Sequence, residues 1–133
     1  MVSLKNLKEK IVVLFFYPKD DTSGCTQEAV AFSDSLIKFK RADAVVLGVS
    51  RDNVAKHRKF KDKHGIKVTL LADEKGEVCE KYGVWVKKKL YGREYMGIER
   101  STFLIFRGKI HKVWRKVKVA KHDKEVLEAV KSI

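Results

Sequence analysis

The residue with the clearest chemical potential is Cys25, which follows a short polar loop at the start of an expected helix. The preceding apolar run, Ile11–Tyr17, ends at Pro18, the only proline in the chain. A helix N-terminus carries about half a positive charge and several N–H groups without intrahelical acceptors. Because such surroundings can bring the pKa of a thiol down from about 8.5 to roughly 3.5–7.5, the sequence predicts a nucleophilic thiolate here.

The elements around this cysteine are predicted to alternate between strand and helix. Ile11–Tyr17 is rich in β-branched and aromatic residues, as expected of a central parallel strand covered on both faces. A helix is predicted over Cys25–Lys40, and Ala44–Val49 is predicted to be a second buried strand. The helix prediction rests on apolar residues at helical spacing, namely Ala29, Phe32, Leu36 and Phe39.

The middle of the chain continues the alternation. Asn53 is a good N-cap and Gly65 a good C′ residue for a helix between them. Val68–Leu71 is predicted to be a short strand. Asp73–Tyr82 is predicted to be a short helix that ends at Gly83.

The last third predicts a hairpin and a closing helix. Thr102–Phe106 and Lys109–Val117 flank a glycine-containing turn, and the closing helix has one apolar face, made by Val126, Leu127 and Val130. This order predicts an α/β protein with a thioredoxin-like fold: a mostly parallel central sheet, an antiparallel edge hairpin and flanking helices. No internal repeat or linker divides residues 1–133, so we expect a single domain.

Composition narrows the class of protein. A chain of 133 residues with 44% hydrophobic content suits one globular core. The longest apolar run is too short to span a membrane, and the N-terminus lacks a secretory signal pattern. Two cysteines without CxxC spacing do not make a disulfide framework. We therefore expect a soluble cytoplasmic protein.

The chain is strongly basic. It has 30 Lys and Arg against 17 Asp and Glu, a net charge of +13. Such a charge attracts nucleic acids or acidic partners. The basic residues are spread from Lys5 to Lys131, however, and Lys87–Lys89 is the longest run. The pattern favours a solvated basic surface over a nucleic-acid site.

The segment Phe16-Tyr17-Pro18-Lys19-Asp20-Asp21-Thr22-Ser23-Gly24-Cys25-Thr26-Gln27-Glu28 closely resembles the active-site loop of peroxiredoxins of the bacterioferritin comigratory protein type, or PrxQ. The family pattern Pro-x-x-x-Thr/Ser-x-x-Cys is met by Pro18, Thr22 and Cys25. Arg100–Ile105 is similar to the family's arginine segment, and two further stretches, Leu70–Asp73 and Tyr82–Trp85, also match. The resemblance covers nearly the whole chain and implies a thiol-dependent peroxidase that reduces hydrogen peroxide and organic hydroperoxides.

The resemblance also implies roles for individual residues. Cys25 would attack the peroxide and become a sulfenic acid, while the permanently cationic Arg100 would stabilise the thiolate and bind the peroxide. The Thr22 hydroxyl can donate and accept hydrogen bonds, and the rigid Pro18 ring would shield the sulfur from water. N–H groups at Gly24 and Cys25 would add donors where charge develops.

Each of these residues also has a simpler interpretation. Taken alone, Pro18 ends a strand, Thr22 caps a helix and Arg100 is one surface arginine among many. Glu28 matches a common family glutamate, which either orients an arginine or is an ordinary acidic residue in the first helical turn. Only the combination favours the catalytic interpretation.

The sequence departs from the family in three places. Ser23 stands where the family usually has proline, which should loosen the loop slightly. The family commonly begins with a further N-terminal hairpin, which this chain is predicted to lack. The usual positions of the resolving cysteine hold Val30 and Lys61. Cys79 follows Val78, which is expected to face the core, so this thiol is interpreted as structural and the mechanism as a one-cysteine mechanism.

The alternatives left open are a two-cysteine enzyme that uses Cys79, a thiol–disulfide oxidoreductase, and a basic binding or chaperone-like module with a vestigial site. An oxidoreductase would want CxxC, but position 28 is Glu28, and a binding module has only Trp85 beside Lys87–Lys89 as a stacking candidate. No cofactor motif is present. His57 and His64 are seven residues apart on one helix with no HExxH motif or carboxylate partner, and they are interpreted as structural rather than metal-binding. The expected partners are a peroxide and a reductant (thioredoxin, glutaredoxin or a low-molecular-weight thiol), with a monomer or weak dimer.

Overall fold

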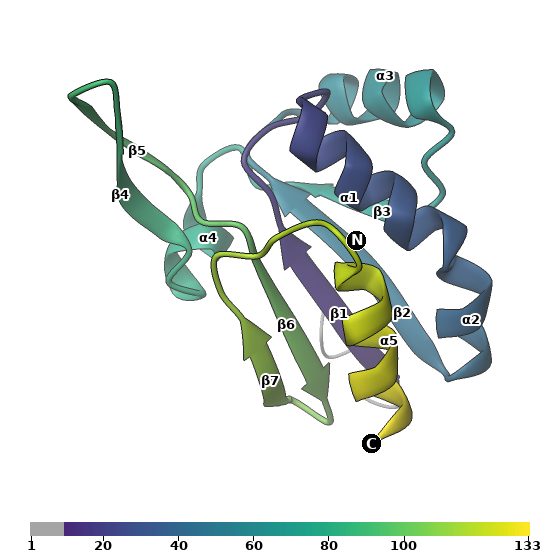
Figure 1. Ribbon diagram of the computed structural model, residues 1–133. Coiled ribbons are helices and arrows are strands. Elements are labelled where there is room, and N and C mark those ends of the chain that lie inside the picture. The colour runs from purple at the N-terminus through teal and green to yellow at the C-terminus, as the bar shows by residue number, and fades with distance from the viewer. Residues whose placement is uncertain (1–9) are drawn as a thin grey trace.

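The computed structural model of the protein describes residues 10–133. A five-stranded sheet in the order β3-β2-β1-β6-β7 forms its centre, and a separate two-stranded hairpin, β4-β5, projects from one side (Figure 1). The sheet strands are β1 Ile11–Phe16, β2 Ala44–Ser50, β3 Thr69–Ala72, β6 Ser101–Phe106 and β7 Lys109–Trp114. The helices are α1 Ser23–Asp34, α2 Leu36–Arg41, α3 Val54–His64, α4 Glu77–Lys81 and α5 His122–Lys131.

The strand directions match the predicted thioredoxin-like sheet. β1 pairs with β2 in parallel, and β2 pairs with β3 in parallel. β6 runs antiparallel to both β1 and β7, so four of the five strands point the same way. The predicted antiparallel edge hairpin is therefore confirmed as β6-β7, closed by a turn in which Arg107 and Gly108 both have positive φ.

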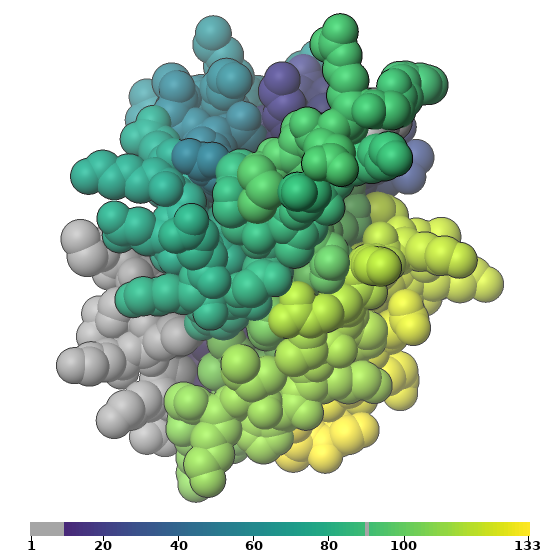
Figure 2. Space-filling model, turned by 90° about the vertical axis from the view of Figure 1, so that its left-hand side faces the viewer, coloured from purple at the N-terminus to yellow at the C-terminus, as the bar shows by residue number. Residues whose placement is uncertain are grey.

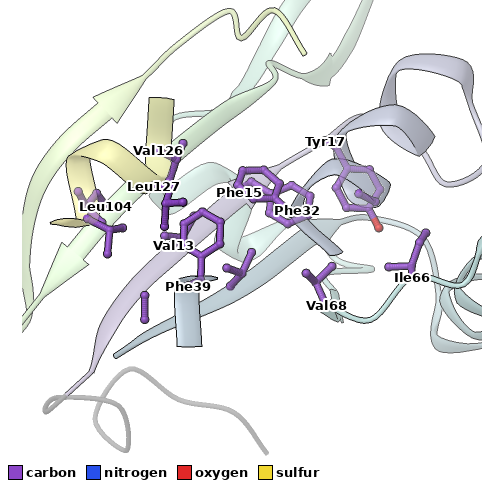
Figure 3. Close-up of a cluster of buried hydrophobic side chains, with 14 of the residues drawn as sticks. Val13, Phe15, Tyr17, Phe32, Phe39, Ile66, Val68, Leu104, Val126 and Leu127 are labelled. Carbon is purple, nitrogen blue, oxygen red and sulfur yellow. The ribbon is translucent and has the colours of Figure 1, made fainter. Parts of the chain in front are cut away.

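Every side chain of β1 is buried, and successive side chains enter two different cores. Val13, Phe15 and Tyr17 join the cluster that α1, α2 and α5 cover, as Figure 3 shows for the side chains it labels. Val12 and Leu14 belong to the cluster on the opposite face, together with residues of α4. Full burial of such side chains contributes roughly 1.5–3 kcal/mol each, so β1 anchors both halves of the fold.

The prediction of one continuous helix over Cys25–Lys40 is wrong. The structure divides it at Ser35 into α1 and α2. The Ser33 hydroxyl donates to the Ala29 carbonyl four residues earlier, a bond that bends helices. The Ser35 hydroxyl donates to Asp123 of α5 at 2.7 Å, which fixes the break against the closing helix.

The second predicted helix is confirmed at both ends. The Asn53 side chain accepts a hydrogen bond from the Lys56 amide, and Gly65 has the left-handed conformation expected at C′. The third predicted helix is shorter than expected: α4 starts at Glu77 rather than Asp73. Asp73 instead lies before the helix and accepts hydrogen bonds from two of its amides.

The sequence prediction missed the β4-β5 hairpin, which comprises Trp85–Leu90 and Arg93–Ile98. Its turn is Tyr91-Gly92, and both residues have positive φ, as a two-residue hairpin turn of type I′ requires. Figure 2 shows the green atoms of this hairpin crossing the face and reaching its upper edge. The Lys87–Lys89 run obscured the strand because three adjacent lysines hide the alternation of buried and exposed positions.

Two sequence predictions concern residues that lie outside the described range. The predicted absence of an N-terminal hairpin, like the absence of a signal pattern, concerns a segment outside residues 10–133. Within that range, none of the helices is both long and apolar enough to cross a membrane.

Candidate active site

Cys25 lies in the first turn of α1, two residues after the helix begins. The first helical hydrogen bond runs from the Thr26 amide to the Thr22 carbonyl at 2.8 Å. The preceding amides of the turn therefore have no acceptor within the helix. The Cys25 side chain is only 2% exposed, so its sulfur lies in a nearly closed site at the positive end of a helix.

Arg100, which immediately precedes β6, is the residue that contacts this sulfur. Its Nη2 donates to Cys25 Sγ at 3.2 Å, and its Nη1 donates to Glu28 Oε1 at 2.7 Å. Gly24 leaves room for this approach, because a Cβ at that position would lie 3.2 Å from Nη2 and would push the guanidinium away by a few tenths of an ångström. The pairing of β6 with β1 thus brings together residues 75 positions apart in the chain.

Glu28 is a buried carboxyl group, 1% exposed, with one oxygen bound to Arg100 and the other, Oε2, without a hydrogen-bond partner. Burial raises the pKa of Glu28 to about 7, and the charge of Arg100 only partly offsets it. One Arg100 guanidinium therefore contacts both the Cys25 sulfur and the Glu28 carboxyl group. We interpret Glu28 as a residue that orients Arg100 rather than as an ordinary first-turn acid.

Glu28 should make the stability of the fold depend on pH. Its pKa is raised from 4.5 to about 7 in the folded protein, so the folded state binds more protons than the unfolded state between these values. The free energy of unfolding should therefore fall as pH rises through this window, by a total of about 3 kcal/mol. Urea unfolding at several pH values should show this fall in the wild type and a flatter profile in Glu28→Gln. Parallel profiles in the two proteins would contradict the burial argument.

The other two predicted site residues lie in the loop before α1. Thr22 occupies the N-cap position of α1, but its side chain makes no cap hydrogen bond. Its hydroxyl donates to the Lys19 carbonyl at 2.8 Å and lies on the exposed side of the loop. Pro18 is half-buried at the point where β1 leads into the loop. Their catalytic roles remain predictions.

Two aspartates fix this loop to α3. Asp20 is buried, and its carboxylate accepts a hydrogen bond from Tyr17 Oη and lies 2.6 Å from His57 Nδ1. His57 Nε2 lies 3.1 Å from the Leu71 carbonyl, so both ring nitrogens face acceptors. Burial lowers the pKa of His57, but the hydrogen bond and charge of Asp20 outweigh it and raise the pKa above its ordinary value.

The second contact between this loop and α3 lies at the surface. Asp21 accepts from Lys63 Nζ at 2.8 Å and lies 2.7 Å from His64 Nε2. The hydrogen bonds from Lys63 and His64 lower the pKa of Asp21. The prediction that no carboxylate partner accompanies His57 and His64 is wrong: Asp20 and Asp21, from the loop before α1, lie against them. Both histidines connect α3 to the Pro18–Thr22 loop.

Cys79 lies on the other side of the central sheet from Cys25. It is fully buried in the core on the opposite face of the sheet from the core that contains Cys25. Burial, with further contributions from the hydrogen bond and charge of Asp73, raises its pKa to about 12. Val78, which was expected to face the core, is 38% exposed instead. The Asp73 carboxylate accepts hydrogen bonds from the amides of both residues and so caps the start of α4.

A cysteine held against an arginine at a helix N-terminus of a thioredoxin-like sheet is the framework of a thiol-based redox enzyme. Comparison with known proteins shows to which family of such enzymes this chain is similar. The model of the AhpC/TSA family matches residues 1–113. The Bacillus subtilis protein named Peroxiredoxin Bcp is 51% identical over 133 residues, covering 99% of this chain and 85% of that protein. A Coxiella burnetii protein named putative peroxiredoxin bcp is 52% identical over 128 residues, covering 96% and 85%.

The solved structures agree. A structure of the Xanthomonas campestris bacterioferritin comigratory protein, described for its alkyl peroxide reduction activity, superposes with a TM-score of 0.95 at 42% identity and covers 98% of this chain and 83% of that one. This chain belongs to the AhpC/TSA family and, within it, to the peroxiredoxins of the Bcp or PrxQ type. It is a thiol-dependent peroxidase, whose substrate is a peroxide and whose electrons come from a thiol.

Proposed function

We propose that the protein reduces hydrogen peroxide and organic hydroperoxides by a one-cysteine mechanism, with Cys25 as the nucleophile and an external thiol as the reductant. The observation that carries this proposal is the hydrogen bond from Arg100 to the Cys25 sulfur. The separation of Cys25 and Cys79 by the central sheet supports the one-cysteine mechanism. Residues 1–133 would act as one thioredoxin-like domain.

The first step is attack on the peroxide. The Cys25 thiolate attacks one oxygen of ROOH, a sulfur–oxygen bond forms, the O–O bond breaks, and RO⁻ leaves and takes up a proton to become ROH. Arg100 stabilises the thiolate and the charge that moves onto the leaving oxygen. Thr22 would hydrogen-bond the peroxide and Pro18 would keep water from the sulfur. Thr22 must then exchange its bond to the Lys19 carbonyl for one to the substrate.

The second step restores the thiol. An external thiol attacks the Cys25 sulfenic acid and releases water, which leaves a mixed disulfide, and a second thiol then releases Cys25. Thioredoxin, glutaredoxin or a low-molecular-weight thiol can each supply these two thiols. Cys25 and Cys79 are both free, which suits the reducing cytoplasm that we propose as its location. We propose a monomer or weak dimer as the active form.

Cys79→Ala separates this mechanism from the two-cysteine alternative. The variant should keep thiol-dependent peroxidase activity, because the Cys79 pKa of about 12 leaves almost no thiolate at neutral pH. Loss of its packing in a closed core should cost about 1–2 kcal/mol of stability. Peroxide-treated wild type should yield a trappable Cys25 sulfenic acid that further peroxide overoxidises.

Mass spectrometry of peroxide-treated wild type decides between the two mechanisms. A dominant intramolecular disulfide between Cys25 and Cys79 would overturn the one-cysteine proposal. That disulfide would require α4 to detach and the two thiols to meet around the edge of the sheet.

A further inference from the structure

The peptide group between Lys19 and Asp20, in the loop before α1, makes a hydrogen bond at each end. Its carbonyl accepts from the Thr22 hydroxyl at 2.8 Å. Its N–H donates to Oδ2 of Asp52 at 2.7 Å, although Asp52 lies 32 positions further along the chain. Because a peptide group is planar and rigid, the bond at one end restrains the direction of the other. The orientation of the Lys19 carbonyl, and with it that of the Thr22 hydroxyl, therefore depends on Asp52.

The central sheet brings Asp52 to this loop. β1 and β2 are parallel, so their carboxyl ends meet at the same edge of the sheet. The Tyr17 amide donates to the Val49 carbonyl at 3.0 Å, which keeps the chain after β1 paired with β2 up to the start of the loop. Asp52 follows the last residue of β2 by two positions. The loop after β1 and the segment after β2 are consequently neighbours at this edge.

The Asp52 side chain is itself held in place for this contact. It is only 7% exposed. The Ser50 hydroxyl donates to the same Oδ2 atom at 2.8 Å, and the Asp52 amide donates back to the Ser50 hydroxyl oxygen at 3.2 Å. The Lys56 ammonium group lies 3.8 Å from the other oxygen, Oδ1, which is too far for a hydrogen bond. The bond from the Asp20 N–H to the Asp52 carboxylate is of the charge-assisted type, which is about twice as strong as a neutral one.

The backbone of Asp21 shows why this peptide group needs a restraint. Asp21 has a φ of 60°, in the left-handed region that a residue with a side chain adopts at a cost in conformational energy. Along the chain, Asp21 connects the Lys19–Asp20 peptide group to Thr22. Without the bond to Asp52, rotation of the peptide group would relieve this conformation. The Lys19 carbonyl would then turn away from the Thr22 hydroxyl.

We propose that Asp52 is a positioning residue for the peroxidase reaction. It fixes the Lys19–Asp20 peptide group, so that the Thr22 hydroxyl starts each turnover in one orientation, three residues before Cys25. Asp52 acts through this peptide group and does not bind the peroxide itself. The inference rests on the proposed function in one respect, that Thr22 hydrogen-bonds the peroxide.

A double-mutant cycle between Asp52→Ala and Thr22→Val tests this inference. The measured quantity is the second-order rate constant for oxidation of the Cys25 thiol by hydrogen peroxide, followed by counting free thiols in a Cys79→Ala background. Asp52→Ala should slow oxidation about ten-fold, since a small misplacement of a reacting group costs up to about 100-fold. In the Thr22→Val background, Asp52→Ala should change the rate by less than about two-fold, because the group through which it acts is gone. Asp52→Asn keeps a neutral acceptor and should stay within about three-fold of the wild type.

Asn53→Ala is the matched control. It removes the neighbouring polar side chain, whose hydrogen bond goes to the Lys56 amide of α3 instead of to the loop. Asn53→Ala should leave the rate within about two-fold of the wild type, because loss of an N-cap weakens the helix by only about 1 kcal/mol. Hydrogen exchange of the Asp20 amide should be faster in Asp52→Ala and unchanged in Asn53→Ala.

Two results would overturn the inference. One is equal slowing by Asp52→Ala with and without the Thr22 hydroxyl, and the other is slowing by Asn53→Ala as large as that by Asp52→Ala. If Asp52→Ala fails to fold by circular dichroism, Asp52→Ser replaces it under the same criteria. Failure of the proposed function would appear without any change at Asp52, because Cys25→Ser would retain turnover or Thr22→Val alone would keep the wild-type rate.

Discussion

Cys25→Ser is expected to lose peroxide reduction completely. A serine hydroxyl does not ionise near neutral pH, so it cannot attack the O–O bond or form a sulfenic acid. The side chain is nearly isosteric and Cys25 is buried, so the fold should be retained. Peroxide consumption with excess dithiothreitol measures the effect, and Cys79→Ser serves as the control. Substantial turnover in Cys25→Ser, with Cys79→Ser inactive, would reverse the assignment of the two thiols.

Arg100→Met is expected to impair both chemistry and stability. Loss of a cation 3.2 Å from the sulfur should raise the titration midpoint of the thiolate by about 1–3 units, which slows attack at neutral pH at least about ten-fold. It also leaves the buried Glu28 carboxylate without its partner, which typically costs about 3 kcal/mol. This cost should shrink at low pH, where Glu28 is protonated.

The double variant Arg100→Met/Glu28→Gln separates the two effects. It removes the orphaned carboxylate, so it should recover most of the stability in urea unfolding at pH 8. It should not recover the rate, because the thiolate still lacks the guanidinium. Equal recovery of rate and stability would mean that Arg100 acts only through folding.

The sequence alone was sufficient to predict the strands and helices that have strong local signals. The all-apolar β1 and the α3 helix between Asn53 and Gly65 were predicted because burial on both faces and capping leave patterns within a few residues. The same turn chemistry occurs at Arg107-Gly108 and Tyr91-Gly92. Only the first was recognised, because its flanking strands are apolar, whereas the second follows a run of lysines.

The site was predictable only in part. Cys25 could be singled out from its own neighbours, but Arg100 entered through the family resemblance, since nothing local marks that arginine among the others. The burial of Glu28 against Arg100 depends on a contact between segments 72 residues apart. A contact of this kind leaves no signature in spacing or composition, and in a helix as short as α4 the sequence did not show whether Val78 or Cys79 faces the core.

The two ties between the Pro18–Thr22 loop and α3 make these segments one cooperative unit. Asp20 is bound to His57 and Asp21 to Lys63, so fraying of α3 also releases the loop that leads into the N-terminus of α1, where Cys25 lies. The inner tie is strongest while His57 carries a proton, and because its pKa is raised, the tie weakens only as pH rises through that value. The conformation of the loop that precedes Cys25 is therefore coupled to the local stability of α3.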